Sequence, residues 1–329
     1  MLKRHRLLLV AVLAAAAVGV VACGNDDEGS GAGANAGAAA PGAPRVLATT
    51  TQAADLVRNV AGDGVEVTQL LAANADPHGY ELRPQDVEAI TDADLVVRSG
   101  GDLDDWLDDA IEQSGADADV VTLIDSVEPL EGDHGHEEAE GEEVDPHWWQ
   151  DPQNAVIAVG EIEQALAAAD PAGGQGYADR ADSYRSDIEA LDQAVAGCWD
   201  KVPAEQRKLV TTHDALGYYA RRYGLEVIGT VIPSLSTQGQ PSAGELAALA
   251  ETISNEGVKV VFAESSVNSK VEQAIADEAG AEVGKALWAD TLGPAGSDGA
   301  TYLESIASNT RAMVDGVTGG AVSCTLPIR

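Results

Sequence analysis

The sequence predicts an α/β protein with two lobes, each a mainly parallel sheet flanked by helices, joined by one long helix. Short runs rich in β-branched residues alternate with longer segments whose apolar residues recur at helical spacing, an order typical of parallel sheets covered by helices. The alternation stops after residue 124 and resumes at 208, which indicates two such units. Between them, residues 174–199 have the periodicity of a single long helix.

The boundaries in the first unit follow from glycine and proline. Gly62 ends the first helix, and Pro84 lies near the start of the second, where proline is tolerated. The apolar stripe of that second helix runs through Val87 and Ile90. We expect strands at 45–50, 65–71, 94–100 and 118–124, and helices at 52–62, 83–93 and 104–115.

The second unit repeats the alternation without a sequence repeat close enough to indicate duplication. Ser242 is a suitable N-cap for one of its helices, and Gly257 a suitable stop. We expect strands at 208–213, 226–232, 259–265 and 282–290, and helices at 214–224, 242–257, 269–280 and 301–317. Helices at 152–170 and 174–199 precede this unit, and the second would span about 35 Å at 1.5 Å per residue.

Residues 1–22 have the pattern of an export signal. A basic start, "MLKRHR", precedes an apolar run that is too short to span a bilayer. The run ends in "VVAC", which resembles the lipobox of bacterial lipoproteins and predicts a lipid on Cys23; ordinary signal cleavage with Cys23 incidental is the alternative. Residues 23–44 are rich in Gly and Ala and indicate a flexible tether. We therefore expect an extracytoplasmic protein anchored to the bacterial cell membrane.

The charge balance of the chain is strongly acidic. Its 55 Asp and Glu residues outnumber its 19 Lys and Arg residues, which gives a formal net charge of −36. This balance argues against nucleic acid as a partner and against electrostatic docking to anionic lipid. It is compatible with cationic ligands, although most of the carboxylates are expected to form a solvated surface.

Two cysteines besides Cys23 remain for pairing in an exported protein. Cys198 and Cys324 lie in an oxidising compartment if the export signal is real. A disulfide between them would stabilise the fold by on the order of 4–5 kcal/mol in the chain-entropy model. Two unrelated buried thiols are the alternative.

The tripeptide Asp-Pro-His occurs twice, at 76–78 and 145–147, in a chain with only six histidines. Proline restricts its own backbone and extends the residue before it, so each imidazole would project from a stiff turn. Asp76 and Asp145 are then candidates to accept a hydrogen bond from the rings. An Asp-Pro turn without such a partner is the alternative.

Candidate metal ligands lie after strands in both units. In open α/β sheets, ligands bind at the carboxyl ends of strands. Two units facing each other would therefore bring together His78, His147, His213 and Asp290. Three imidazoles and a carboxylate are a suitable set for Zn²⁺. On spacing alone, three scattered histidines are more often surface or core residues than metal ligands.

From about residue 45 to its end, the chain resembles the metal-binding substrate-binding proteins of zinc and manganese ABC transporters. The segments that carry the resemblance are, in order, "DPHGYELRP", "DPHWWQDP", "HDALGYYARRYGLEVIG", "VKVVFAESSVNSK" and "LWADTLG". The resemblance implies an N-terminal lobe at 45–170, a rigid connecting helix at 171–200 and a C-terminal lobe at 201–329, with the metal in the cleft. It implies the ligands His78, His147, His213 and Asp290, with Glu264 beside them and not itself a ligand.

The resemblance also bears on the identity of the metal. Zinc members of the family carry histidine where His213 stands, whereas manganese members carry glutamate, and imidazole prefers Zn²⁺ to Mn²⁺. The acidic loop at 131–144, with His134 and His136, resembles a loop of zinc members and is an auxiliary metal site or a solvated loop. The segment "FAESSV" is closer to manganese members, so Mn²⁺ is the alternative.

The predicted function is therefore a receptor that captures Zn²⁺ outside the cytoplasm and delivers it to an ABC permease with its cytoplasmic ATPase. We expect a monomer that performs no chemistry. A zinc hydrolase is an alternative, but Asp290 as a fourth ligand argues against an open catalytic position. An adhesin with a structural metal is a further alternative.

Overall fold

The computed structural model describes residues 42–130 and 144–328 of the chain. Backbone contacts divide the chain into residues 1–35 and 36–329, and every described residue belongs to the second of these units. In the described ranges, none of the helices combines the length and the apolar character that crossing a bilayer requires.

Several sequence predictions lie outside the described residues. These are the export signal at 1–22, the lipid on Cys23 with most of its tether, and the two histidines His134 and His136 of the acidic loop. They stay predictions.

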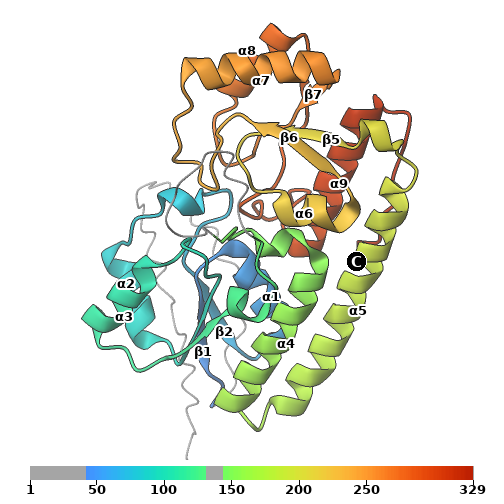
Figure 1. Cartoon of the computed structure of the whole chain (residues 1–329). Coiled ribbons are helices and arrows are strands. Elements are labelled where there is room, and N and C mark those ends of the chain that lie inside the picture. Colours follow the sequence, from blue (N-terminus) through green and yellow to red (C-terminus); the bar gives the residue numbers. More distant parts are fainter. Residues whose placement is uncertain (1–41, 131–143, 329) are drawn as a thin grey trace, which may run out of the picture. The chain divides into compact units, whose positions relative to one another are not determined.

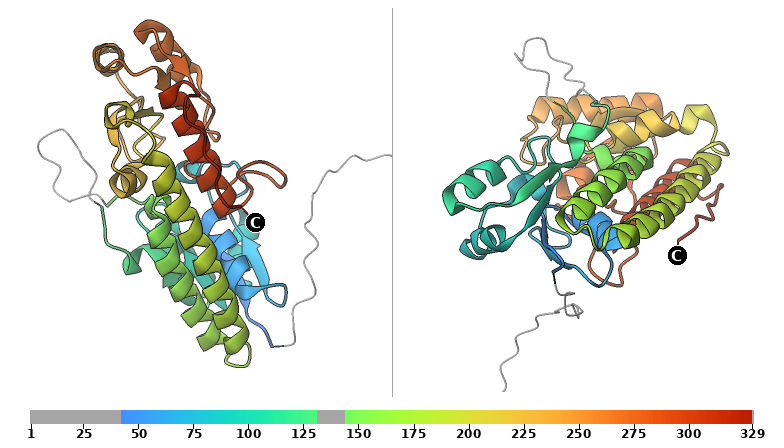
Figure 2. Two further views of the ribbon diagram at one scale, coloured as in Figure 1. Left: turned by 90° about the vertical axis from the view of Figure 1, so that its right-hand side faces the viewer. Right: turned by 90° about the horizontal axis from the view of Figure 1, so that it is seen from below.

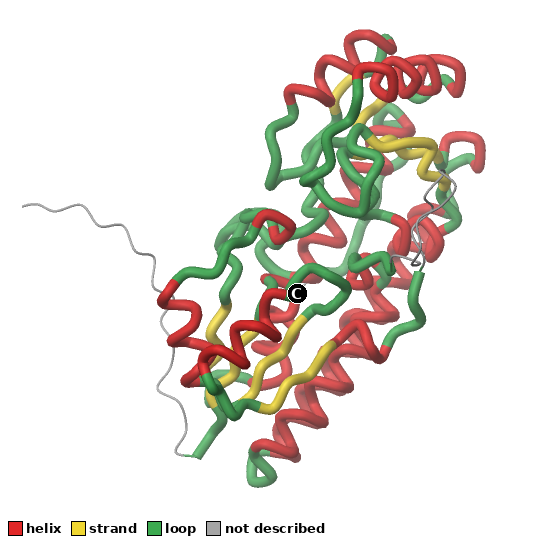
Figure 3. Tube along the Cα trace, turned by 60° about the vertical axis from the view of Figure 1, so that its left-hand side comes forward, coloured by secondary structure: helices red, strands yellow, loops and turns green. Residues whose placement is uncertain are grey.

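The first lobe is built on a four-stranded parallel sheet with the order β2-β1-β3-β4 (Figures 1 and 3). Its strands are β1 (Arg45–Ala48), β2 (Glu66–Gln69), β3 (Leu95–Arg98) and β4 (Asp119–Thr122). Its helices are α1 (Thr51–Ala61), α2 (Pro84–Asp92) and α3 (Trp106–Ser114), and the short 3₁₀ helix η2 (Leu123–Ser126) follows β4.

Both faces of this sheet are buried, as expected for parallel strands. Successive side chains of a strand point to opposite faces, and in β1 Val46 and Ala48 pack into the core under α1 while Leu47 packs into the core under α2 and α3. The strand therefore reads as a continuous apolar run.

Two long antiparallel helices, α4 (Pro152–Ala169) and α5 (Gly174–Trp199), cover the α1 side of the first lobe (Figure 2). At 26 residues, α5 is long enough to reach the second lobe, about 39 Å at 1.5 Å per residue. Its buried Asp192 accepts hydrogen bonds from Arg222 and Tyr223, which follow the first strand of that lobe. The long helix predicted at 174–199 is thus present and contacts both lobes.

The second lobe has its strands in the same order as the first, and its last two strands are shorter. They are β5 (Lys208–Thr211), β6 (Glu226–Thr230), β7 (Val260–Val261) and β8 (Glu282–Val283), all paired in parallel. A bridge from Thr211 to Phe262 joins the two pairs, so the order is β6-β5-β7-β8. The helices of this lobe are α6 (Gly217–Tyr223), α7 (Ala243–Glu256), α8 (Lys270–Ala279) and α9 (Tyr302–Thr318), with the 3₁₀ helix η4 (Ala204–Gln206) before β5.

Two predicted strands are much shorter than expected. The strand predicted at 259–265 pairs regularly only at Val260–Val261. The sequence predicts a strand over 282–290, but regular pairing ends at Val283 and resumes only as a bridge between Glu264 and Leu287. Beyond Leu287, the backbone of Trp288 bonds to a side chain instead of a strand: Asn309 of α9 pairs with both its N–H and its carbonyl. The helix predicted at 214–224 likewise begins later, at Gly217.

The structure pairs Cys198 with Cys324 in a disulfide, with a Cα–Cα distance of 5.7 Å. Cys198 is buried in the last turn of α5, and Cys324 lies in the segment after α9. The disulfide therefore fastens the end of the chain to the connecting helix.

Candidate metal centre

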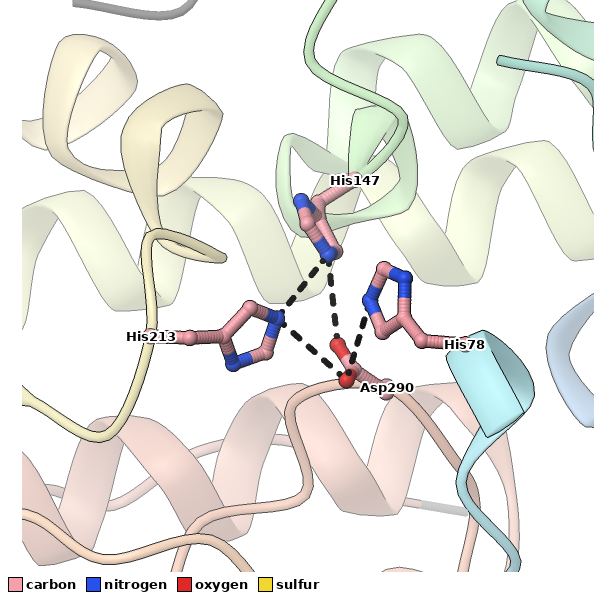
Figure 4. Close-up of side chains that lie close together, drawn as sticks. All are labelled: His78, His147, His213 and Asp290. Carbon is pink, nitrogen blue, oxygen red and sulfur yellow. Dashed lines mark hydrogen bonds and ion pairs between the residues drawn. The ribbon is translucent and has the colours of Figure 1, made fainter. Parts of the chain in front are cut away.

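Four side chains from distant parts of the chain converge where the two lobes meet (Figure 4). One ligand atom from each lies within 4.8 Å of all the others: His78, His147, His213 and Asp290. These are the four positions that the sequence predicts. The Oδ2 atom of Asp290 lies 3.5 Å from His78 Nε2 and 3.3 Å from His213 Nε2, and its Oδ1 lies 3.4 Å from His147 Nε2.

Each of the four residues is placed by the end of a regular element. His78 lies on the 3₁₀ turn η1 (Pro77–Gly79), in the loop after β2. His147 directly precedes the 3₁₀ turn η3 (Trp148–Gln150), which leads into α4. His213 follows β5, and Asp290 follows the bridge at Leu287. The carboxyl ends of both sheets thus supply the cluster.

Three of the four side chains are closed off from solvent. The exposed fraction is 0% for the side chains of His147, His213 and Asp290, and 7% for His78. His78 lines a cavity of about 190 Å³ together with Tyr80 and Trp106 of the first lobe and Leu235 of the second. Among these four side chains, the one nearest to solvent is therefore His78.

The second Asp-Pro-His turn holds its own imidazole. Asp145 Oδ1 lies 2.7 Å from His147 Nδ1 and also accepts the backbone N–H of His147 at 2.9 Å. A carboxylate only accepts, so Nδ1 carries a proton in either charge state of the ring, and in the neutral ring Nε2 presents its lone pair to the centre. Burial lowers the pKa of His147, but Asp145 and Asp290 outweigh it and raise that pKa to about 10.

Two glycines make room for this turn. Gly101 has φ +67°, which favours glycine, and a Cβ there would lie 3.0 Å from the Cα of Pro146. At the start of α6, a Cβ on Gly217 would lie 2.8 Å from Asp145 Oδ2. The turn with its carboxylate can therefore pack against both lobes.

Glu264 holds the ring of His213 in the same manner. Its Oε1 lies 2.5 Å from His213 Nδ1 and accepts the backbone N–H of His213 at 3.2 Å. Burial lowers the pKa of His213, whereas Asp290 and Glu264 raise it, and the net direction is upward. Glu264 therefore lies behind an imidazole, on the side away from the cluster.

The centre of the cluster is lined by acceptor atoms that face one another. His147 Nε2 and His213 Nε2 are 3.2 Å apart, and in each ring, when it is neutral, the proton lies at Nδ1 beside a carboxylate. Both carboxylate oxygens of Asp290 are buried, and among the described residues only the three imidazoles face them, at 3.3 to 3.5 Å, without the geometry of a hydrogen bond. Buried acceptors without donors are unfavourable. A cation at the centre would satisfy all of them.

Asp290 is ionised, as a ligand to a cation must be. Burial acts to raise its pKa, but His213 and the other two imidazoles lower it well below the usual range. The cluster therefore offers one anionic oxygen ligand and three nitrogen ligands, a donor set that suits a borderline divalent cation such as Zn²⁺.

The first Asp-Pro-His turn differs from the second. Asp76 Oδ1 accepts the backbone N–H of His78 at 2.9 Å, and its Oδ2 accepts the hydroxyl of Thr237 at 2.6 Å. Within the described residues, no hydrogen bond joins Asp76 to the ring of His78. The expectation that both aspartates bond to their rings therefore describes Asp145 but not Asp76, which connects its turn to the second lobe.

Three other hydrogen bonds at the site were not predicted from the sequence. Gln150 and Trp149 donate hydrogen bonds to the carbonyl of Ala289, next to Asp290, and Thr237 bonds to Asp76. Their partners lie more than a hundred residues away, so no local pattern indicates them. The only available signal is a polar residue, Gln150, inside an apolar turn beside His147.

Comparison with known proteins identifies the family. Residues 46–316 match the family model described as zinc-uptake complex component A, periplasmic. The chain belongs to this family. Zinc-uptake component A proteins are metal-binding substrate-binding receptors of ABC transporters and not enzymes, as the resemblance implied.

Relatives of this chain are named for different metals. The zinc-binding protein TroA of Treponema pallidum is 31% identical over 281 residues, which cover 84% of the chain and 89% of TroA. The manganese-binding lipoprotein MntA of Halalkalibacterium halodurans is 28% identical over 264 residues, covering 80% of the chain and 85% of MntA. The iron-binding protein YfeA of Yersinia pestis is 30% identical over 262 residues, covering 80% and 82%.

Solved structures show the same two-lobed fold. The periplasmic zinc-binding protein TroA matches with a TM-score of 0.77 and 29% identity, covering 84% of the chain and 99% of that structure. A manganese-bound periplasmic metal-binding protein from Candidatus Liberibacter asiaticus matches with a TM-score of 0.75 and 25% identity, covering 83% and 99%. The predicted fold class is therefore confirmed.

Proposed function

We propose that this protein is the extracytoplasmic receptor of an ABC importer, and that it captures Zn²⁺ and delivers it to the membrane permease. The ligands would be His78, His147, His213 and Asp290. The observation that carries the proposal is the buried centre in which three imidazole nitrogens and one carboxylate converge. A divalent cation is the ligand that such a set of nitrogen and oxygen atoms suits.

Zinc is favoured by the nitrogen content of the site. Three imidazoles and one carboxylate suit Zn²⁺, while carboxylate, carbonyl and water ligands suit Mn²⁺. His213 supplies the third nitrogen, and Glu264 turns that ring toward the centre. A manganese receptor is the second candidate, because a relative that is 28% identical is named as a manganese-binding lipoprotein.

The remaining parts of the receptor follow from the sequence. We propose that a lipid on Cys23 anchors the protein to the outer face of the cytoplasmic membrane and that 23–44 act as its tether. The folded chain would act as a monomer, with lobes at 45–170 and 201–329 connected through 171–200. Its partners would be a permease and the cytoplasmic ATPase of that permease.

Metal binding by the purified, metal-stripped protein tests the proposal. Competition calorimetry with Zn²⁺ and Mn²⁺ should give one tightly bound zinc per chain and much weaker manganese binding. His213→Ala should abolish tight zinc binding, while replacement of His134, which lies in the acidic loop, should leave it. Tight manganese binding without zinc binding would overturn the choice of metal but not the receptor.

Transport is tested in cells. Deletion of the gene should prevent growth in zinc-depleted medium, and added zinc should restore growth. The His213→Ala protein should fail to complement the deletion. Normal growth of the deletion strain under zinc depletion would contradict a role in zinc import and would favour adhesion.

A further inference from the structure

Asp290 differs from two of the other proposed ligands in how it is held. The rings of His147 and His213 are each fixed from behind by a carboxylate, Asp145 or Glu264. The oxygens of Asp290 have no such partner, since within the described residues only the three imidazoles lie against them. The orientation of this carboxylate must therefore come from its backbone.

That backbone is bonded on both sides of Asp290. The carbonyl of Ala289 accepts two side-chain hydrogen bonds, from Trp149 Nε1 at 3.0 Å and from Gln150 Nε2 at 2.7 Å. The backbone N–H of Leu292 donates to Thr51 Oγ1 at 2.8 Å. Ala289 to Leu292 is thus held as a short strap across Asp290.

All of these contacts come from the first lobe, although the strap continues a chain segment of the second. Leu287 still belongs to the second-lobe ladder, because its N–H donates to Ala263 and its carbonyl accepts from Ser265. The next residue, Trp288, is held by Asn309. The chain therefore passes from second-lobe to first-lobe partners between Trp288 and Ala289.

We propose that Trp149 and Gln150 are positioning residues for Asp290, acting through the carbonyl of Ala289. Both belong to η3, the turn that begins directly after His147. One turn therefore sets two of the proposed ligands, and with them the 3.4 Å separation of His147 Nε2 and Asp290 Oδ1. The inference rests on the proposed metal-binding function of the site.

The chain offers a matched control for Trp149 in its neighbour. Trp148 is also buried, and its indole N–H donates to the carbonyl and hydroxyl of Ser99, at 3.3 and 3.1 Å, within the first lobe. Trp148→Phe and Trp149→Phe therefore each remove one buried indole donor from the same turn. Only the second removes a donor to the strap.

Gln150→Met supplies a second test of the strap. Trp149 also packs edge-on against the ring of His147, with 5.5 Å between ring centroids, so its replacement affects more than the hydrogen bond. Gln150 donates to the same carbonyl by its side-chain amide, and methionine keeps its size without the donor. Agreement between the two variants isolates the role of the Ala289 carbonyl.

The experiment measures zinc affinity by chelator competition, the visible spectrum of the Co²⁺-substituted protein, and hydrogen exchange of 287–293 without metal. Trp149→Phe and Gln150→Met should each weaken zinc binding by about 10- to 100-fold, the range for groups that orient ligands. They should also change the Co²⁺ bands, which report ligand geometry, and speed exchange in the strap. Trp148→Phe should stay within about 3-fold in affinity with an unchanged spectrum, since it leaves the ligand-orienting contacts intact.

The outcomes separate this inference from the proposed function. Equal affinities, spectra and exchange rates for Trp148→Phe and Trp149→Phe, with Gln150→Met like wild type, would overturn the positioning role while leaving zinc binding intact. If wild type binds neither metal, the proposed function fails. Hydrogen exchange then decides alone whether Trp149 and Gln150 hold the strap.

Discussion

The two Asp-Pro-His turns share a tripeptide, yet the structure surrounds them differently. In the turn at 145–147, the aspartate bonds to the ring and to the backbone N–H of its own histidine, and the whole turn is buried. In the turn at 76–78, the aspartate bonds to the backbone N–H of His78 and to Thr237 of the second lobe. The ring of His78 lines the cavity beside the site.

The difference shows that the tripeptide places an imidazole but does not decide how the ring is held. In both places the aspartate accepts the backbone N–H of the histidine two residues later, but His78 lies within a 3₁₀ turn whereas His147 directly precedes one. At 145–147 the turn packs against both lobes, and within the described residues the carboxylate of Asp145 bonds only to the backbone and the ring of His147. At 76–78 the second lobe provides a hydroxyl, so the carboxylate connects the lobes. Of these two proposed ligands, His147 is thus the one held by a carboxylate behind its ring, and His78 the one at the rim of the site.

The largest expected differences in zinc affinity between the two turns come from removing each imidazole. His147→Ala should weaken zinc binding by more than about 100-fold, because it removes a ligand and leaves Asp145 buried without its partner. His78→Ala should weaken it by about 10-fold, because solvent at the rim can replace the lost nitrogen. Chelator competition at fixed pH gives both values. A loss for His78→Ala as large as that for His147→Ala would contradict the distinction.

Replacing each aspartate tests the roles of the two carboxylates. Asp145→Asn should weaken zinc binding by about 10- to 100-fold, since it removes the charge that orients and polarises the ring of His147. Asp76→Asn should weaken it by only about 2- to 3-fold, since it leaves the ring of His78 untouched and removes one charged hydrogen bond partner.

The double variants provide the control for this prediction. In the His147→Ala background, Asp145→Asn should have little further effect on affinity, because the ring it acts on is gone. Equal effects of Asp76→Asn and Asp145→Asn in the wild-type background would show that the two turns hold their rings alike.

The contact between Asp76 and Thr237 gives the smallest expected effect. Thr237→Val should speed zinc dissociation by about 2-fold, because one hydrogen bond between the lobes is lost and such a bond contributes about 0.5–1.5 kcal/mol. Stopped-flow transfer of zinc to a chelator measures this rate. Thr237→Val combined with Asp76→Asn should be no faster than the quicker single variant. Fully additive effects would mean that the two residues act independently.

Much of the fold was predictable because its signals are local. The apolar runs of β1 and β3 indicate strands buried on two faces, and the stripe of 174–199 indicates the long helix that the structure contains. The strand expected at 282–290 was overestimated because apolar residues alone do not show where pairing stops. Regular pairing stops at Val283, and after the bridge at Leu287 the backbone of Trp288 bonds instead to Asn309, from a helix later in the chain.

The sequence by itself indicated the fold class through the periodicity of its strands and helices, and the family resemblance of short segments indicated the four positions that converge. Only the tertiary structure decided which aspartate holds a ring, which one joins the lobes, and that Gln150 bonds beside Asp290 from 139 residues away. Hydrogen bonds over such separations depend on how the lobes pack, and nothing within one turn of sequence encodes their partners.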